Sequence, residues 1–303
     1  DIPAEFGSGR IALDVALIQT SPPDENGFMT FGVSIDIVKA AAENARVVIA
    51  EVNDQMPRVL GDTLIHVNEV DALVPISRPL PEYRMPEPDD RIRKIAGHLA
   101  DLIDDGSTVQ IGIGRIPQAV VEHLTHKRNL GIHTEMFTDS IMGLIKSGAV
   151  TCTQKTINRG KVVATFCMGT RELYEFVDNN PFLEFYPTEY VNDPFVIAQH
   201  MDMVSINVAL EVDLTGQVCA DSLGHKFYSG FGGQVDFTRG AARAKNGKPI
   251  IAMPSTAKND TVSRIVPLLS PGAGVTITRA DVYYVVTEYG VAYLHGKRVQ
   301  ERA

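Results

Sequence analysis

The sequence has no tryptophan, three cysteines and no long run of apolar residues. Cys152, Cys167 and Cys219 form no C-x-x-C pair, so we expect buried thiols in a reducing, cytoplasmic compartment rather than disulfides or a zinc cage. No segment approaches the roughly 18 apolar residues of a membrane helix. A net charge of −9 without a long basic run disfavours nucleic acid. We therefore expect a protein that binds neither membrane nor nucleic acid.

The length of the chain and a cluster of prolines predict two domains. At about 150 residues per domain, 303 residues suit two globular units. Residues 1–74 contain an apolar strand, an alanine-rich helix and a β-branched strand, which indicates a parallel crossover unit with few strands. Five prolines then crowd residues 75–88, where we expect a linker without regular structure. Residues 89–303 form the predicted second domain.

Apolar runs alternate with amphipathic segments along the whole chain, which predicts an α/β fold with parallel or mixed sheets. We expect strands at 13–20, 47–52, 108–111, 130–134, 161–166, 204–210, 249–253 and 281–287, and helices at 35–44, 89–104, 117–127 and 137–147. In such folds the loops at the carboxyl ends of the strands bind ligands.

One candidate loop, 112–117 (GIGRIP), joins a predicted strand to a helix. Glycines there let a ligand approach the backbone, and the helix start offers N–H groups to an anion. A dinucleotide fingerprint would need glycine where Pro117 stands, and no Gly-Lys-Ser/Thr follows, so Rossmann and P-loop interpretations fail. A plain tight turn remains an alternative.

Acidic residues follow two predicted strands. Glu135 precedes a helix, where it and Asp139 would equally serve as first-turn acids that complement the helix dipole. Glu288 follows the strand 281–287. His133 is read as a structural partner, and without an H-x-x-x-H or H-E-x-x-H motif we expect no metal site.

A second glycine-rich segment, 228–237, has three glycines within four residues but no G-x-S-x-G elbow, so a serine-hydrolase triad has no support. Two glycine-rich loops and carboxylates at strand ends fit one scheme best. In that scheme a carboxylate attacks an activated acyl group, and backbone N–H groups stabilise the oxyanion.

Several ordered motifs resemble the acetyl-CoA hydrolase/transferase family, in the branch of 4-hydroxybutyrate and butyrate:acetate CoA-transferases. They include SPPDENGFMTFGVSID (21–36), GIGRIPQAV (112–120), LGIHTEMFTDS (130–140), YSGFGGQVDFTRGA (228–241) and VVTEYGVAYL (285–294). The similarity covers essentially all 303 residues. It implies two α/β domains of CoA-transferase type. Because relatives carry a longer N-terminal portion, we expect the first domain to be incomplete in this chain.

The resemblance also implies roles for individual residues. Glu135 would be the nucleophile, the N–H groups of Ile113 and Gly232 the oxyanion hole, and Asn192 a residue that orients the nucleophile. Glu288 would be a second acid that lines the site. The remaining expected contacts with CoA or substrate are Met56, Pro57, Gly112, Gly114, Arg115, Ile116, Tyr228, Gly230, Gly233, Gln234 and Lys258.

The implied activity is ping-pong transfer of CoA from a short-chain acyl-CoA to a carboxylate such as acetate, through a glutamyl-CoA thioester. Hydrolysis of acyl-CoA on the same residues is an alternative, and so is a non-catalytic acyl-CoA-binding subunit. We expect no permanently bound cofactor, because acyl-CoA is the substrate, and we expect a homodimer, as is usual for such relatives.

Overall fold

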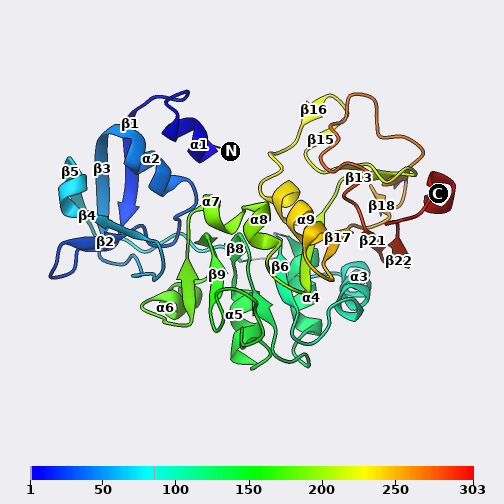
Figure 1. Ribbon diagram of the computed structural model, residues 1–303, viewed down its shortest axis with the longest axis horizontal. Helices are drawn as coiled ribbons and strands as arrows, with labels where there is room; N and C mark the ends of the chain where they lie inside the picture. The colour runs from blue at the N-terminus through cyan, green and yellow to red at the C-terminus, as the bar shows by residue number, and fades with distance from the viewer. Residues whose placement is uncertain (1, 85, 113) are drawn as a thin grey trace. The chain divides into compact units, whose positions relative to one another are not determined.

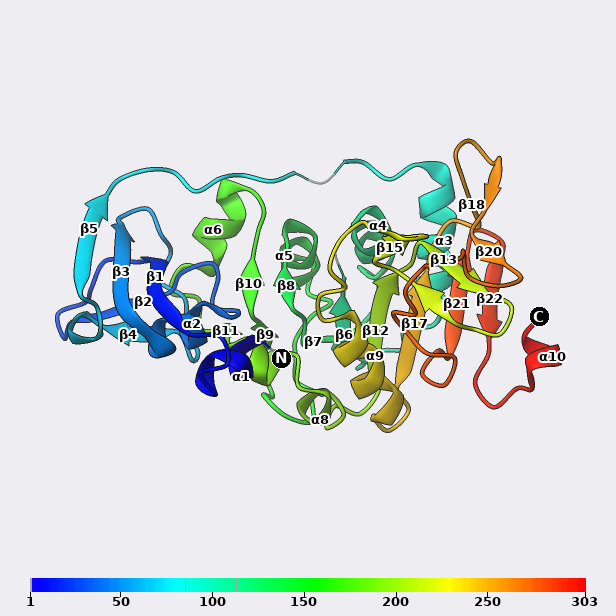
Figure 2. The same ribbon diagram turned by 90° about the horizontal axis from the view of Figure 1, so that it is seen from above.

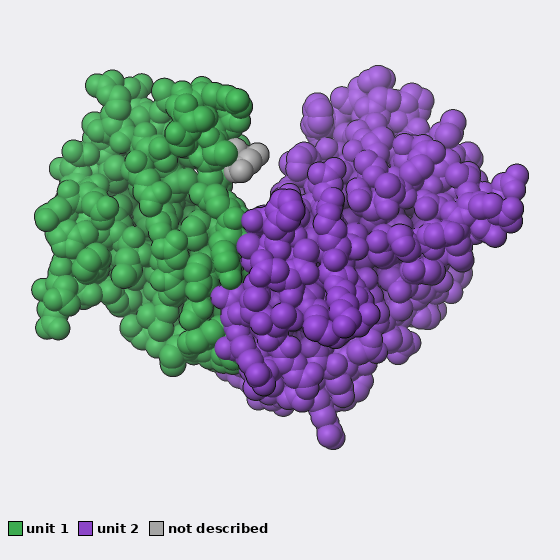
Figure 3. Space-filling model, viewed as in Figure 1, with its two compact units in different colours: residues 1–84, 132–143, 160–191 green, residues 85–131, 144–159, 192–303 purple. Residues whose placement is uncertain are grey.

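The computed structural model describes residues 2–84, 86–112 and 114–303 (Figure 1, Figure 2). Its contacts divide the chain into two compact units, coloured separately in Figure 3. Unit 1 comprises residues 1–84, 132–143 and 160–191, and unit 2 comprises residues 85–131, 144–159 and 192–303. Unit 1 therefore includes two segments, 132–143 and 160–191, from the stretch predicted as the second domain.

A three-stranded parallel sheet forms the first part of unit 1. Its order is β1 (Leu13–Thr20), β3 (Ala45–Asn53) and β5 (Ala72–Ile76), and helix α2 (Val38–Asn44) connects the first two strands and contacts β1. This arrangement confirms the predicted strand–helix–strand unit with few strands. Alternate residues of β1 such as Ala16 and Ile18 are buried, as the period of a strand with one covered face requires.

The prediction that residues 75–88 hold no regular structure is wrong at its start. Strand β5 continues to Ile76, and Pro75 pairs with Val52 of β3. The sheet order places β5 at the edge, where the absent N–H of a proline removes no bond to a further strand.

Short parallel pairs complete unit 1 and carry the segment around Glu135. Strand β8 (Met136–Phe137) pairs with β10 (Phe166–Cys167), and β9 (Val162–Ala164) pairs with β11 (Leu183–Phe185). The helix predicted at 137–147 is α5 (Asp139–Lys146), because the backbone of Phe137 is used in β8. The other elements are α1 (Ile2–Gly7), β2 (Phe28–Thr30), β4 (Leu64–His66), η1 (Val67–Glu69), α6 (Arg171–Val177) and α7 (Thr188–Val191).

Unit 2 is built on a sheet of order β22-β21-β17-β12-β6-β7. Strands β6 (Thr108–Ile111), β12 (Met203–Val208), β17 (Lys248–Ala252) and β21 (Tyr284–Thr287) run parallel, and β22 (Gly290–Tyr293) is antiparallel. Figure 2 shows helices α3 (Asp90–Asp101) and α4 (Arg115–His123) on one face and α9 (Gln234–Arg243) on the other. Every residue of β6 is buried, as expected for a strand covered on both faces.

Several predicted bounds in unit 2 were too long. Helix α4 ends at His123 instead of residue 127, and the strand predicted at 130–134 is β7 (Gly131–Ile132). The remaining elements are α8 (Pro194–Ile197), β13 (Glu211–Asp213), β14 (Val218–Cys219), β15 (Ser222–Leu223), β16 (Lys226–Phe227), β18 (Thr256–Ala257), β19 (Val262–Ser263), β20 (Ile265–Val266) and α10 (Val299–Arg302). Within the described residues, no helix has the length and apolar character needed to cross a bilayer. All three cysteines are buried, and none of them forms a disulfide within the described part of the chain.

Candidate functional site

The carboxyl ends of four parallel strands bring most of the predicted site residues of unit 2 to one edge of the sheet. The loop 112–114 follows β6, the segment 254–258 follows β17, and Glu288 follows β21. The central strand β12 ends at Val208, whose carbonyl accepts a hydrogen bond from Gln234 Nε2 at 3.2 Å. Because Gln234 begins α9, this bond holds the second glycine-rich loop at the same edge.

The first glycine-rich loop lies close to the end of β12. The N–H of Gly112 donates to the carbonyl of Ile206 at 3.1 Å, and a Cβ at position 112 would stand 2.9 Å from that oxygen. Gly114 caps α4 with φ 123° and ψ 178°, a conformation that residues with a Cβ rarely adopt. Ile113, predicted to supply one oxyanion donor, lies outside the described residues. At the start of α4, Arg115 is exposed, whereas the side chain of Ile116 is buried.

The second glycine-rich loop exposes its backbone. Tyr228 is 71% exposed, and Gly230 and Gly232 are also exposed, whereas Gly233 is buried at the start of α9. Gly232 has φ 54°. Among the residues that the structure describes, none accepts a hydrogen bond from the Gly232 N–H. That amide is therefore available to an anionic oxygen, as an oxyanion donor must be.

Glu288 is a fixed, ionised acid. The N–H and the hydroxyl of Ser255 donate to its two carboxylate oxygens at 2.9 and 2.8 Å, and Arg91 Nε lies 3.6 Å from one of them. Desolvation alone would raise the pKa of this carboxyl, but the Ser255 hydrogen bonds and the Arg91 charge outweigh it and hold the pKa below its ordinary value. At neutral pH Glu288 accepts hydrogen bonds and does not donate a proton.

Lys258 occupies an unusual turn between β18 and β19. Lys258, Asn259 and Asp260 have φ values of 50°, 52° and 66°, so three successive residues with a Cβ adopt the left-handed region. The Lys258 side chain is exposed, and no described carboxylate pairs with it. Asn192 lies elsewhere, directly after α7 and two residues before α8, which packs against α9.

Glu135 belongs to unit 1 and stands in an otherwise buried segment. His133, Thr134, Met136 and Phe137 are at most 2% exposed, whereas Glu135 is partly exposed. Its carbonyl accepts hydrogen bonds from the N–H groups of Thr165 and Phe166, at 3.0 and 3.2 Å. His133 Nε2 lies 2.8 Å from the carbonyl of Val191, which bears out the structural partner expected of this histidine. The backbone that bears the carboxylate is thus fixed on both sides.

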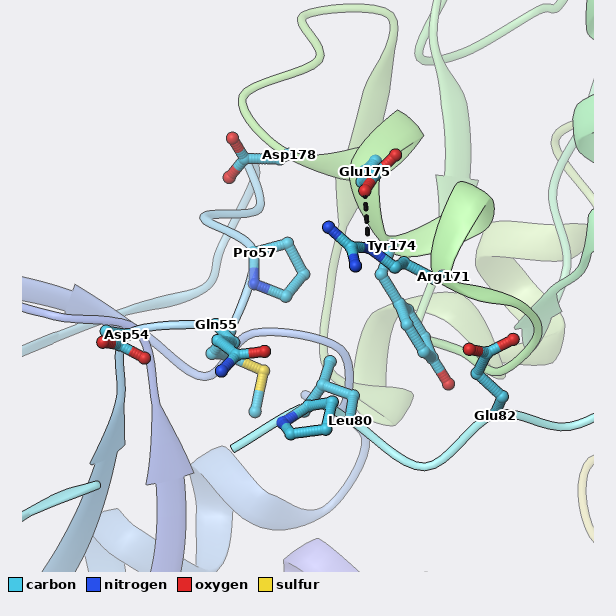
Figure 4. A pocket seen from close by; sticks show the side chains of 11 residues that line it. Asp54, Gln55, Pro57, Leu80, Glu82, Arg171, Tyr174, Glu175 and Asp178 are labelled. Carbon is cyan, nitrogen blue, oxygen red and sulfur yellow. Dashed lines mark hydrogen bonds and ion pairs between the residues drawn. The ribbon is translucent and has the colours of Figure 1, made fainter. Parts of the chain in front are cut away.

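Met56 and Pro57 line a cavity of about 470 Å³ in unit 1, which Glu135 does not line (Figure 4). Both residues are buried, and Met56 Sδ would lie 2.2 Å from a Cβ at Gly32. The full lining is Asp54, Gln55, Met56, Pro57, Pro79, Leu80, Glu82, Arg171, Tyr174, Glu175 and Asp178. Arg171 pairs with Glu175 at 2.7 Å, so three other carboxylates remain and disfavour phosphate.

Arg91 and Ser255 are site residues that the sequence analysis missed. Arg91 is one of several charged residues on α3, and nothing in its spacing separates it from Arg93. Ser255 lies within the PSTAK segment that contains Lys258, so proximity to that lysine was the available signal. Both contact Glu288, which lies far from Arg91 along the chain.

A parallel sheet whose carboxyl edge carries glycine-rich loops, a cation and a fixed acid is typical of ligand-binding α/β enzymes. Within the described ranges, no three histidine, cysteine or acidic side chains are placed to hold a metal ion. Comparison with known proteins makes the class specific. The family models of the acetyl-CoA hydrolase/transferase N-terminal and C-terminal domains match residues 2–78 and 169–303.

Individual relatives agree with these matches. The chain is 54% identical to a 4-hydroxybutyrate coenzyme A transferase of Clostridium kluyveri, over 100% of this chain and 71% of the relative. The crystal structure of a 4-hydroxybutyrate CoA-transferase from Porphyromonas gingivalis superimposes with a TM-score of 0.89 at 47% identity, covering 100% of this chain and 72% of the other. An acetyl-CoA hydrolase of Neurospora crassa is 25% identical over 96% of this chain and 62% of its own length.

The chain belongs to the acetyl-CoA hydrolase/transferase family. The family resemblance inferred from the motifs is thereby confirmed, together with the α/β fold of CoA-transferase type.

Proposed function

We propose that this protein is a CoA-transferase that moves CoA from a short-chain acyl-CoA to an acceptor carboxylate such as acetate. Membership of the family and relatives that are named CoA-transferases support the reaction class. The setting of Glu135 carries the proposal for this chain. It is a partly exposed carboxylate in a segment whose four nearest neighbours are buried, which suits a nucleophile that must reach substrate from a rigid backbone.

The proposed chemistry proceeds by two exchanges on Glu135. Its carboxylate oxygen attacks the thioester carbonyl, the C–S bond breaks, and an acyl-glutamyl anhydride and CoA thiolate form. The thiolate then attacks the glutamyl carbonyl and releases the acyl group as a carboxylate, which leaves a glutamyl-CoA thioester. An acceptor carboxylate reverses both steps and departs as the new acyl-CoA.

Other residues supply the remaining functions in this proposal. The N–H groups of Ile113 and Gly232 stabilise the oxyanion, and removing one such donor typically lowers kcat by about 10²–10³. The exposed, otherwise unused amide of Gly232 supports its part. Asn192 orients the nucleophile, Lys258 and Tyr228 contact CoA, and Glu288 lines the site as a fixed negative charge.

Chemical trapping tests the covalent intermediate. After incubation with acyl-CoA, borohydride reduces a glutamyl thioester to the alcohol, which peptide mass spectrometry should locate at Glu135. Glu135→Gln should abolish both labelling and transfer, whereas Glu51→Gln, at a carboxylate paired with Arg78 in the same unit, should preserve both. Labelling elsewhere, or full activity of Glu135→Gln, contradicts the proposal.

The requirement for an acceptor separates transfer from hydrolysis. The similarity to an acetyl-CoA hydrolase makes hydrolysis the second candidate, since water can replace the acceptor acid on the same residues. We expect CoA turnover from butyryl-CoA to depend on added acetate. Release of free CoA at full rate without acetate would favour the hydrolase, and binding without either reaction would favour a non-catalytic subunit.

We also propose that the active protein is a cytoplasmic homodimer whose first domain contains more chain than unit 1. The outer face of the β1-β3-β5 sheet supports the added chain, because Val15, Leu17, Val47 and Val74 are 37–78% exposed there. The chain spans 71% of its Clostridium kluyveri relative. Intact-mass analysis of the natural protein tests the added chain, and a species of 33.0 kDa would contradict it. Light scattering, which measures the mass of the particle in solution, tests the proposed homodimer.

A further inference from the structure

One guanidinium group in unit 2 contacts three segments that are far apart in the sequence. Arg91 Nη1 donates to Thr256 Oγ1 at 3.1 Å, Nη2 donates to Asp260 Oδ1 at 2.7 Å, and Nε lies 3.6 Å from Glu288 Oε1. Arg91 lies in the first turn of α3, whereas Thr256 and Asp260 flank Lys258 and Glu288 follows β21. The group therefore links a helix, a hairpin turn and a strand end.

The turn that Arg91 contacts needs external support. Residues 258–260 are all left-handed, and a run of such residues persists only where surrounding contacts determine it. The hairpin of β18 and β19 contributes two residue pairs, and Thr261 Oγ1 donates to the Lys258 carbonyl at 2.7 Å. Asp260 accepts from both Arg91 and Thr256, so its carboxylate connects the end of the turn to α3.

The orientation of the turn decides where the Lys258 ammonium lies. That side chain is exposed, and within the described part of the chain no acidic group pairs with it. A cation held on a fixed backbone without a protein counter-ion is available to an anionic ligand. The phosphate groups of CoA are the anions that the proposed substrate offers.

We propose that Arg91 is a positioning residue for phosphate recognition, which holds the strained 258–260 turn so that Lys258 meets the phosphates of CoA. This inference rests on the proposed function. Only a planar fork with several donors can satisfy the three partners at once, so lysine is not an equivalent of Arg91. Neither Ser255 hydrogen bond to Glu288 involves Arg91, so we expect the main consequence of losing Arg91 to fall on the turn.

A truncated substrate isolates this role. Acyl-pantetheine has the same thioester as acyl-CoA but lacks the nucleotide and its phosphates. Arg91→Ala should lower kcat/KM for acyl-CoA by about 10-fold or more, the usual effect of losing a hydrogen bond to a charged group. The same variant should match wild type with acyl-pantetheine. A merely structural defect would lower both values equally and would overturn the proposal.

A double-mutant cycle tests whether Arg91 acts through Lys258. Lys258→Ala should cause a similar loss with acyl-CoA, and Arg91→Ala combined with Lys258→Ala should lose no more than either alone. Arg93→Ala is the matched control on the same helix, since Arg93 pairs with Glu122 at 3.2 Å on an exposed surface, and it should match wild type. Additive losses in the cycle would refute action through Lys258.

Two further measurements keep the test decisive. If Arg91→Ala fails to fold by circular dichroism, Asp260→Asn removes the charge from the same link and should reproduce the acyl-CoA defect. Calorimetric titration with CoA itself reports binding without turnover. If the CoA affinities of the variants follow the expected double-mutant cycle but the protein transfers no CoA, the proposed function alone is overturned. If Arg91→Ala leaves the affinity for CoA unchanged, this inference alone is overturned.

Discussion

Gly114→Ala should separate conformational strain from steric clash at the predicted oxyanion loop. Gly114 has φ 123° and ψ 178°, yet a Cβ added there would meet only Pro117 Cδ, at 4.0 Å. Space is therefore available, and the backbone conformation alone opposes the substitution. A residue with a Cβ held in this region costs about 1–3 kcal/mol. We expect Gly114→Ala to lower the free energy of unfolding by an amount in that range.

The matched control is a glycine in an ordinary helical backbone conformation. Gly97 lies inside α3, with no atom within 4 Å of an added Cβ. Glycine in a helix interior is about 0.5–1 kcal/mol less favourable than alanine, so Gly97→Ala should stabilise the protein by that amount. The two substitutions add the same methyl group to the same unit and should have opposite signs.

Urea unfolding followed by circular dichroism measures both effects as shifts in midpoint at constant slope. If the loop relaxes instead of bearing the strain, Gly114→Ala should retain stability but lose transfer activity, because the backbone conformation at the start of α4 changes. The refuting result is a Gly114→Ala protein with wild-type stability and wild-type activity. That outcome would mean that the special backbone conformation at position 114 has no energetic or functional consequence.

Two further predictions concern Glu288 and the packing of Met56. The lowered pKa of Glu288 stabilises the fold above the ordinary value of 4.5, and this contribution disappears as the pH falls through the folded value, so Glu288→Gln should flatten the acid side of a stability-against-pH curve. An unchanged acid limb in urea titrations would contradict this. Gly32→Ala should destabilise unit 1, because its Cβ would meet Met56 Sδ at 2.2 Å and its φ is 68°. Met56→Ala should relieve the clash, and a cycle of thermal unfolding measurements should show coupling of about 0.5–3 kcal/mol.

The sequence predicted those elements whose signals are local. The strand at 13–20 and the strand at 108–111 have the predicted bounds, because segments rich in apolar and β-branched residues, each followed by turn residues, specify them. The prediction that a helix begins at Phe137 was wrong. An apolar residue before a helical pattern gives no sign that its backbone pairs with that of Cys167. Strand pairing between residues far apart in the sequence also places segments 132–143 and 160–191 in unit 1. Periodicity indicates that a strand is buried, but not in which sheet.

In the candidate site, too, the features with a local sequence signal could be predicted, and those that depend on long-range contacts could not. Glycines and strand-end acids can be read from the sequence because each follows an apolar run. The Arg91 links cannot, since they join residues 165 and 169 positions apart and depend on the packing of α3 beside β21. The left-handed run at 258–260 is equally hidden, because none of its three residues is a glycine. Turn chemistry read from composition misses strain that tertiary contacts impose.

The ionised state of Glu288 has a consequence for the proposed chemistry. An acid held by two hydrogen bonds and an arginine charge cannot protonate a leaving group at neutral pH. The proposed reaction needs no such donor, because both groups that depart are stable anions. A carboxylate leaves from the anhydride, and CoA leaves as a thiolate whose conjugate acid has a pKa near that of an ordinary thiol, about 8.5. What the transition states require is stabilisation of negative charge on the carbonyl oxygen. The exposed amide of Gly232 is suited to that task.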